Sequence, residues 1–354
     1  MLHSFATKTI HLLIDWLIAL LGIVLILWFG FTLPSFSLSK SNEKNSSLNI
    51  QQSDLKNHVE ALSNYYAPRT IEYGNLNVTA SYIHTEFAKY GNAQYQPYWT
   101  LASRYKNVLL ELGPKTKEML VIGAHYDAKN GSLDIDGNAS GVSALIELAH
   151  QLSKNEDKLS IAVQLVAYPL SQKKSVSIEN MGSYQHARQL SEAGKSVKLM
   201  LSLDSVGSFT DENESQKYPY KFMHHIYPDI GNYISLVGRL QDYSEILKLK
   251  KSFKQASKLP MHSFSIPTSY TSNSVDHLNY QRYGFPAMMI TDTAEYRVFE
   301  DDKDELVERL DYKKMSMLVE GLYQVVLDNK SPEIAVELVQ ISPNAEFSLK
   351  VDEN

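Results

Sequence analysis

Three stretches of the sequence decide the fold: GAHYDA at 123–128, DIDGNASGVSALIELA at 134–149 and LSLDSVG at 201–207. The first and third are apolar runs that end on polar residues, at His125 and Asp204. The second begins with Asp, Gly and Asn and continues with apolar residues at helical spacing. Buried strands that end on polar residues and are followed by helices are typical of α/β proteins.

Strand and helix patterns alternate on both sides of these stretches. Continuous apolar runs such as MLVIGA and AVQLVA suit a sheet that is covered on both faces. The sequence therefore predicts an α/β fold with a mixed, largely parallel central sheet flanked by helices. The predicted strands are 106–112, 118–124, 161–168, 197–204 and 287–291. The predicted helices begin near Leu55 and Thr79 and cover 140–152, 181–192, 231–240 and 312–328.

The composition excludes several classes of site. The 354 residues carry a net charge of -6, which gives no indication of nucleic acid as a partner. Cysteine is absent, so disulfides, thiolate metal sites and a Cys nucleophile are excluded. Four lysines at 248, 250, 251 and 254 are spaced like the solvated face of a helix.

The N-terminal region predicts a membrane anchor. Residues 16–33, WLIALLGIVLILWFGFTL, carry no charge, and as a helix they would span roughly 27 Å, close to the thickness of a bilayer core. A cleavable signal peptide is the alternative, but the run is long and no A-x-A pattern follows it. We expect an uncleaved single-pass anchor. Since a short tail precedes it and a large domain follows, we expect that domain to be exported, either periplasmic or extracellular.

The chain divides into five predicted parts. A short tail (1–9) precedes the transmembrane anchor (10–33), and a linker rich in Ser, Asn and Lys follows (34–53). The α/β domain covers 54–330, and 331–354 form a C-terminal tail.

Together the motifs resemble the zinc aminopeptidase and glutaminyl cyclase family, metallopeptidase family 28. The three opening stretches are joined by ENMGSYQHA at 179–187 and GFPAMMITDTAEYR at 284–297, and the similarity runs from about Leu55 to Leu327. This resemblance implies a zinc-exopeptidase-like fold. It also implies a site in which two zinc ions share a bridging carboxylate and a water, while a separate Glu acts as general base.

The family's first metal site is partly retained. By resemblance, His125 is its metal-ligating imidazole, Asp127 the residue that orients this imidazole, and Asp204 the carboxylate on the same metal. The place of the bridging carboxylate, however, is taken by Gly137, which has no side chain, although Asp136 is its neighbour.

The second metal site and the general base are replaced. Where the family has a Glu-Glu pair, this chain has Ser171 at the general-base place and Gln172 at the ligand place. The last metal-binding His belongs in the segment VFEDDKDELVER, which contains no His and offers Asp301 or Asp302 instead. A serine hydroxyl is not a base near neutral pH, and a neutral amide is a poor zinc ligand.

The favoured interpretation is therefore a membrane-anchored, aminopeptidase-like protein that binds a peptide or protein ligand without hydrolysing it. We expect no zinc, or one residual zinc held by His125, Asp204 and Asp136. The alternative is an active aminopeptidase that uses a single metal. Glutaminyl cyclase-type chemistry ranks lowest, because it also needs an acidic residue where Ser171 stands.

One other combination could suggest a hydrolase. Ser274, Asp276 and His277 contain the residue types of a catalytic triad, but closeness in sequence does not produce triad geometry. We expect these residues to have a structural role or to line the site.

Overall fold

A mixed sheet forms the centre of the molecule, as predicted, but it has eight strands rather than the five predicted. The computed structural model describes residues 2–32, 48–71, 74–100, 102–128, 136–171, 176–218, 220–264, 276–297, 306–330, 336–337 and 350–351. The strand order is β1-β2-β4-β3-β5-β8-β6-β7. The strands are β1 Ala93–Thr100, β2 Ser103–Leu112, β3 Glu118–His125, β4 Ala162–Tyr168, β5 Ser196–Leu203, β6 Ile234–Val237, β7 Met261–Phe264 and β8 Ala287–Thr291.

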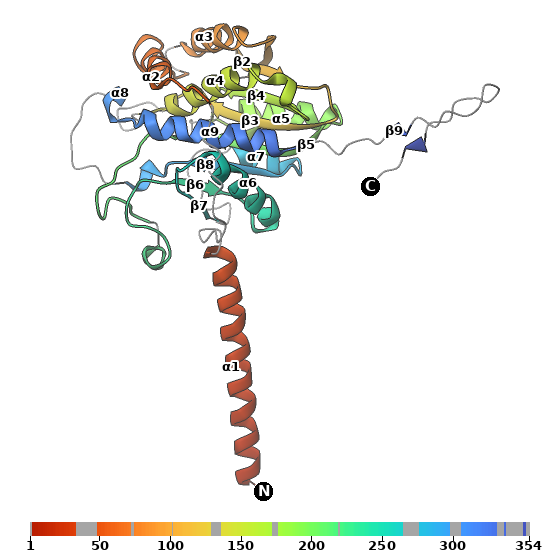
Figure 1. The fold of residues 1–354 in the computed structure, drawn as a ribbon, viewed down its shortest axis with the longest axis vertical. Helices are drawn as coiled ribbons and strands as arrows, with labels where there is room; N and C mark the ends of the chain where they lie inside the picture. The colour runs from red at the N-terminus through yellow and green to blue at the C-terminus, as the bar shows by residue number, and fades with distance from the viewer. Residues whose placement is uncertain are drawn as a thin grey trace, which may run out of the picture.

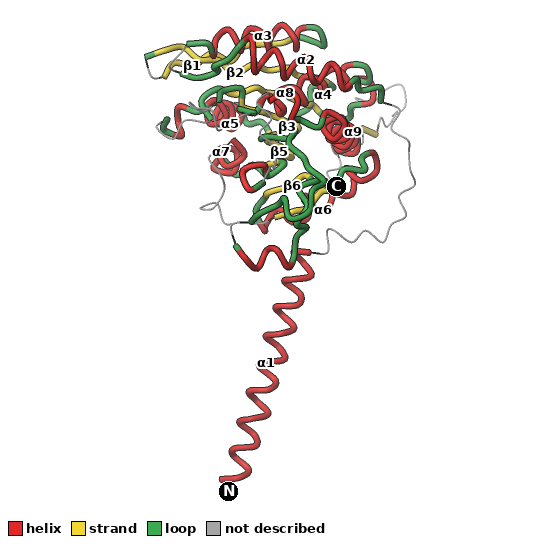
Figure 2. Tube along the Cα trace, turned by 90° about the vertical axis from the view of Figure 1, so that its left-hand side faces the viewer, coloured by secondary structure: helices red, strands yellow, loops and turns green. Residues whose placement is uncertain are grey.

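Helices cover both faces of this sheet (Figure 1). Seen from the side, α5 and α7 lie on one face and α9 lies on the other (Figure 2). The larger core joins α2, α3, α4, α6 and α9 to the sheet, and the smaller core includes residues of α5 and α7. The helices are α1 Leu2–Thr32, α2 Gln52–Glu60, α3 Leu76–Ala88, α4 Ala139–Ser153, α5 Gly182–Glu192, α6 Tyr243–Ala256, α7 Asp276–Arg282, α8 Leu306–Arg309 and α9 Tyr312–Asp328.

The centre of the sheet is parallel, and this places the site. β3 pairs in parallel with β4 and with β5, and β5 pairs in parallel with β8. Every residue of β4 is buried, as are all but the first of β3, which explains their continuous apolar sequences. Parallel strands end at the same edge of the sheet, so the polar residues after these strands converge there.

Two predictions were wrong. Residues 231–240 do not form a helix, because Ile234–Val237 is the buried strand β6, between β7 and β8. These four residues, Ile-Ser-Leu-Val, are paired on both sides, so their backbone groups find partners in the sheet. The lysine face is also only partly solvated: on α6 the Lys248 side chain is 71% exposed, whereas Lys250 is 3% exposed, with its amine 3.4 Å from the Ser263 hydroxyl.

The N-terminal helix α1 projects away from the domain (Figure 1). Among the residues whose structure is described, no helix is both long and apolar enough to cross a membrane. The predicted linker and C-terminal tail lie mostly outside the described residues, apart from the last linker residues and the short strands β9 Val336–Glu337 and β10 Lys350–Val351.

Candidate functional site

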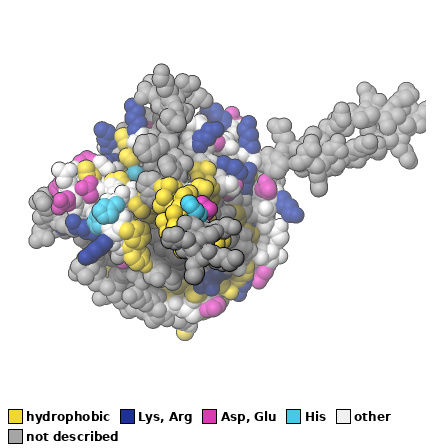
Figure 3. All heavy atoms as spheres, turned by 90° about the horizontal axis from the view of Figure 1, so that it is seen from below, with side chains coloured by type: hydrophobic (Ala, Val, Ile, Leu, Met, Phe, Trp, Pro, Cys, Tyr) yellow, Lys and Arg dark blue, Asp and Glu magenta, His cyan; other side chains and the backbone are white. Residues whose placement is uncertain are grey.

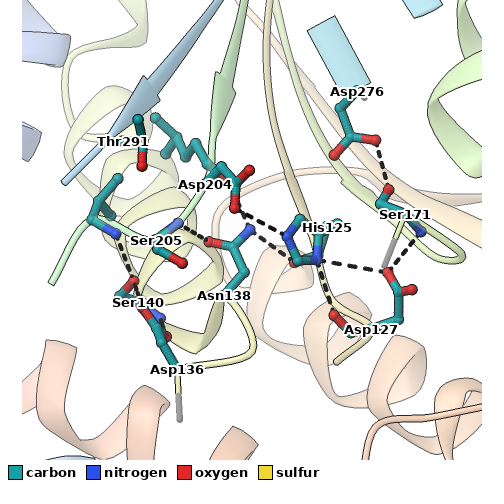
Figure 4. A network of polar contacts seen from close by, with 12 residues as sticks. His125, Asp127, Asp136, Asn138, Ser140, Ser171, Asp204, Ser205, Asp276 and Thr291 are labelled. Carbon is teal, nitrogen blue, oxygen red and sulfur yellow. Dashed lines mark hydrogen bonds and ion pairs between the residues drawn. The ribbon is translucent and has the colours of Figure 1, made fainter. Parts of the chain in front are cut away.

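His125 and Asp204 meet at the carboxyl end of the parallel strands (Figure 4). His125 is the last residue of β3, and Asp204 directly follows β5, its neighbour in the sheet. The imidazole is fully buried and Asp204 is 8% exposed. His125 Nε2 lies 3.4 Å from Asp204 Oδ1. The two side chains that the resemblance assigns to one metal therefore lie side by side.

Asp127 orients His125 through its backbone. The imidazole Nδ1 hydrogen bonds to the Asp127 carbonyl oxygen at 2.9 Å, whereas the nearest carboxylate oxygen is 3.7 Å away, too far for a hydrogen bond. The carboxylate instead accepts the Ser171 backbone N–H at 3.0 Å. Asp127 thus joins the end of β3 to the turn that follows β4.

Ser171, at the general-base place, is buried and bonded to a second carboxylate. Its hydroxyl donates to Asp276 Oδ1 at 2.6 Å, from the first residue of α7. Asp276 is fully buried, and its other oxygen has no hydrogen-bond partner within the described residues. Burial raises the pKa of the Asp276 carboxyl to about 6, against the opposing influence of His125 and of the Ser171 hydrogen bond.

The turn before α4 holds Asp136 away from the metal-ligand pair. Asp136 Oδ1 accepts the Ser140 N–H at 2.8 Å, and Oδ2 accepts the Ser140 hydroxyl, so the carboxylate caps the start of α4. Asn138 joins the turn to the strand ends: its amide donates to the carbonyls of His125 at 3.1 Å and Leu203 at 2.9 Å. The backbone N–H of Ser205 donates to the amide oxygen of Asn138 at 2.9 Å.

Two metal donors are in place, but a third is not. Zinc bonds of about 2.1 Å at tetrahedral angles separate two donor atoms by roughly 3.4 Å, so the spacing of His125 and Asp204 would suit a shared ion. Within the described ranges, however, no group of three or more His, Asp or Glu side chains is placed to hold a metal. Gly137 has no donor, and Asp136 is bound to Ser140. The described residues therefore do not fit a zinc centre of the family type.

Without metal, His125 and Asp204 form an ion pair. Burial of the ring opposes its protonation, but Asp204, Asp127 and Asp276 outweigh this effect and raise the pKa of His125 to about 10. The imidazole then donates from both nitrogens, to Asp127 O and to Asp204 Oδ1. A protonated imidazole has no free lone pair for a metal.

Some predicted positions cannot be placed, and others were missed. Gln172 and Asp301 lie outside the described residues. Asp276 was expected to have a structural role or to line the site, but its partner Ser171, 105 residues away in sequence, was not predicted. Arg69 was missed because no motif surrounds it, although its side chain is buried beside the Gly137 turn.

Sequence comparison gives two matches. The pattern of peptidase family M28 matches residues 107–326. The uncharacterized protein YfbL of Escherichia coli (strain K12) is 35% identical over 288 residues, which cover 78% of this chain and 88% of that protein.

Solved structures share the fold at low identity. LapA aminopeptidase of Legionella pneumophila has a TM-score of 0.61 at 15% identity, covering 82% of this chain and 75% of that one. The Bacteroides thetaiotaomicron glutaminyl cyclase bound to N-acetylhistamine has a TM-score of 0.57 at 15% identity. The match covers 80% of this chain and 99% of that one. For BSAP, a zinc aminopeptidase from Bacillus subtilis, the TM-score is 0.60 at 11% identity. The match covers 82% of this chain and 98% of that one.

Proposed function

Because the chain belongs to peptidase family M28, we propose that it is a member that has lost its metals and its peptidase activity and binds a ligand instead. One observation carries this proposal: the family resemblance puts Gly137, which has no side chain, at the place of the bridging carboxylate, and Ser140 holds the carboxylate of the neighbouring Asp136. In this family the bridge serves both metals, so its loss weakens both sites together.

The general-base place supports the same proposal. A buried hydroxyl at Ser171 replaces the Glu that the family resemblance leads us to expect, and loss of a general base lowers rates by about 10²- to 10⁴-fold. The buried polar groups His125, Ser171 and Asp204 lie at the ends of strands, where α/β proteins bind ligands, and Asp276 at the start of α7 is bonded to Ser171. We propose a peptide or protein ligand at this edge of the sheet.

A single-zinc peptidase is the second candidate. The 3.4 Å separation between His125 Nε2 and Asp204 Oδ1 favours it, since two donors at this spacing are half of a tetrahedral site. The two candidates differ in what they predict for zinc and for hydrolysis.

We expect the purified full-length protein, kept in detergent, to retain no stoichiometric zinc after zinc is added and excess removed. It should hydrolyse aminoacyl-p-nitroanilides no faster than its His125→Ala variant, because a metal-activated water and a base are both missing. Metal content by mass spectrometry and initial rates check this. LapA aminopeptidase is the positive control. Two bound zinc ions, or hydrolysis that His125→Ala abolishes, would overturn the proposal, and one zinc with such hydrolysis would establish the second candidate.

We also propose that the N-terminal segment around the uncharged run at 16–33 anchors the domain in a membrane. The length of this run supports the proposal, as does the exposure of apolar side chains such as Trp16 at 69% and Ile26 at 72%. Figure 3 looks along α1 from its N-terminal end, and Lys and Arg side chains are scattered over this side of the domain. Basic residues near a bilayer surface are attracted to anionic lipids.

The full-length protein should stay in the membrane pellet after alkaline carbonate extraction, because an inserted apolar helix does not depend on ionic contacts. A matched chain that begins at Leu48 should appear in the supernatant. Full-length protein in the carbonate supernatant would contradict the anchor.

A further inference from the structure

A lysine amine is buried between α6 and β7, away from the strand ends that carry His125 and Asp204. Lys250 on α6 is only 3% exposed, and its Nζ lies 3.4 Å from the Ser263 hydroxyl on β7. Met261 and Ser263 point to the same face of β7, because side chains alternate along a strand. Met261 belongs to the larger core together with Ile246 and Leu249 of α6. This is therefore the face of β7 that α6 covers.

No carboxylate compensates the charge of this amine. The described residues place no Asp or Glu side chain within ion-pair distance of Lys250, whereas the exposed Lys248 pairs with Glu245 at 2.7 Å. Lys254, one turn further along α6, adds a second positive charge, and residues 246–258 hold five lysines and no acid. Burial and then Lys254 lower the pKa of the Lys250 amine to about 7. A charged amine here therefore costs stability unless an anion pairs with it.

The amine lies close to the edge of the sheet. β7 is the last strand in the order of the described sheet, and Ser263 and Lys254 are only half-buried. Burial, Lys250 and Lys254 lower the pKa of His262 to about 4, so this neighbouring ring on β7 is neutral near pH 7. An ion that approaches β7 from its free edge therefore meets a hydroxyl, a buried amine and the charge of a second lysine.

We infer that a phosphate group binds between α6 and β7, held by the Lys250 amine and the Ser263 hydroxyl. Lysine binds phosphate as a point charge, and phosphate oxygens accept hydrogen bonds from both groups. The charge of Lys254 adds a longer-range attraction. A bound phosphate would also compensate the buried charge that the fold leaves unpaired.

The phosphate group could belong to a soluble compound or to a lipid headgroup. Both views of the fold place α6 at the end of the domain from which α1 projects (Figures 1 and 2). This position makes a lipid headgroup the source to compare with free phosphate. The inference depends neither on the proposed loss of metals nor, for free phosphate, on the membrane anchor.

The ordinary alternative is that Lys250 is a neutral amine that donates to Ser263 and binds nothing. Phosphate would then change stability only through its general effect as a salt, which strengthens the burial of surface in every variant alike. The difference between variants therefore separates the two roles.

The test follows thermal unfolding of the full-length protein in detergent at pH 7 by circular dichroism. Inorganic phosphate at about 50 mM, compared with chloride of equal ionic strength, should raise the Tm of the wild type by about 4 °C, because it binds only the folded state. Lys250→Met should keep less than about 1 °C of this shift. Lys248→Met is the matched control, the same substitution on the exposed side of α6, and it should shift as the wild type does.

Nanodiscs without free phosphate separate the two sources. If a lipid headgroup is the ligand, replacing part of the phosphatidylcholine with anionic phosphatidylglycerol should raise the Tm of wild type and Lys248→Met but not of Lys250→Met. A Lys250-dependent shift with inorganic phosphate alone would assign the site to a soluble compound.

Equal shifts in all three proteins, or no shift with either source, would overturn the inference, as would a shift that Lys248→Met loses as well. We expect Lys250→Met to fold, since it removes a buried charge and keeps an apolar chain. If it does not fold, Ser263→Ala decides. That variant should lose at least about half of the phosphate shift, because one of the two hydrogen-bond donors is gone, and a full shift would overturn the inference.

Discussion

At pH 4 a His186→Gln variant should be more stable than the wild-type protein, although it should be less stable at pH 7. His186 lies on α5, 1% exposed, and its Nδ1 accepts a hydrogen bond from the Tyr280 hydroxyl. That hydroxyl is in turn 2.7 Å from the hydroxyl of Tyr168. Burial lowers the pKa of His186 to about 3. The native protein therefore keeps this ring neutral over most of the acidic range.

The sign of the effect follows from proton binding. In the unfolded chain a His has its ordinary pKa of 6.5, whereas the pKa of native His186 is about 3, so stability falls as the pH drops through this window. For this group the loss between pH 7 and pH 4 is about 3 kcal/mol. Glutamine does not titrate, and its carbonyl can still accept from Tyr280. At pH 7 it should cost roughly 1 kcal/mol in packing.

Urea unfolding followed by far-UV circular dichroism at pH 7, 5.5 and 4 checks this prediction. Tryptophan fluorescence is a poor probe, since Trp99 on the β1–β2 hairpin is 76% exposed and the other two tryptophans lie in α1. The exposed His224→Gln is the matched control, and it should follow the wild type at every pH. If His186→Gln and wild type lose stability in parallel, the buried ring does not govern acid sensitivity.

The sequence predicted the parallel centre of the sheet because each strand there is a buried apolar run. β3 and β4 could be predicted from the sequence alone, because burial on both faces of the sheet leaves a continuous run of apolar residues. The strands toward the edges of the sheet were harder to predict. β1 reads AQYQPYWT with polar residues and a Pro, a pattern typical of edge strands but also of loops. β6 and β7 have only four residues each and are defined by their pairing with each other and, for β6, with β8.

The contacts of the candidate site were likewise predictable only in part. The family resemblance put His125 and Asp204 on one metal, and in the structure they lie side by side because β3 and β5 are neighbours in the sheet. The Ser171–Asp276 hydrogen bond and the contact of Arg69 with the Asp136 carbonyl join segments 105 and 67 residues apart. No local pattern encodes such pairs, because they arise from the packing of loops against the finished sheet. The sequence therefore indicated His125 and Asp204 but not these long-range contacts.

Asp276 is a buried carboxyl whose charged form is destabilising, and this suggests that it is retained for a reason other than stability. Its exposed fraction is 0%, and its Oδ2 has no hydrogen-bond partner among the described residues. Because burial raises its pKa to about 6, the folded state binds this proton more tightly than the unfolded chain, in which the pKa of an Asp has its ordinary value of 3.8. The resulting stability is present below pH 3.8 and is lost as the pH rises through 6.

An Asp276→Asn variant should therefore be more stable than wild type by about 3 kcal/mol at pH 8, and by less than about 1 kcal/mol at pH 4. Asparagine keeps an oxygen that can accept from the Ser171 hydroxyl, so the substitution removes the charge and leaves that hydrogen bond. Urea midpoints at the two pH values measure the difference, with the exposed Asp157→Asn as a matched control. Equal stability of Asp276→Asn and wild type at pH 8 would mean that neighbouring groups already stabilise the negative charge of the buried carboxylate. A gain confined to high pH would identify Asp276 as a group whose buried charge costs stability, as is common for residues kept for binding.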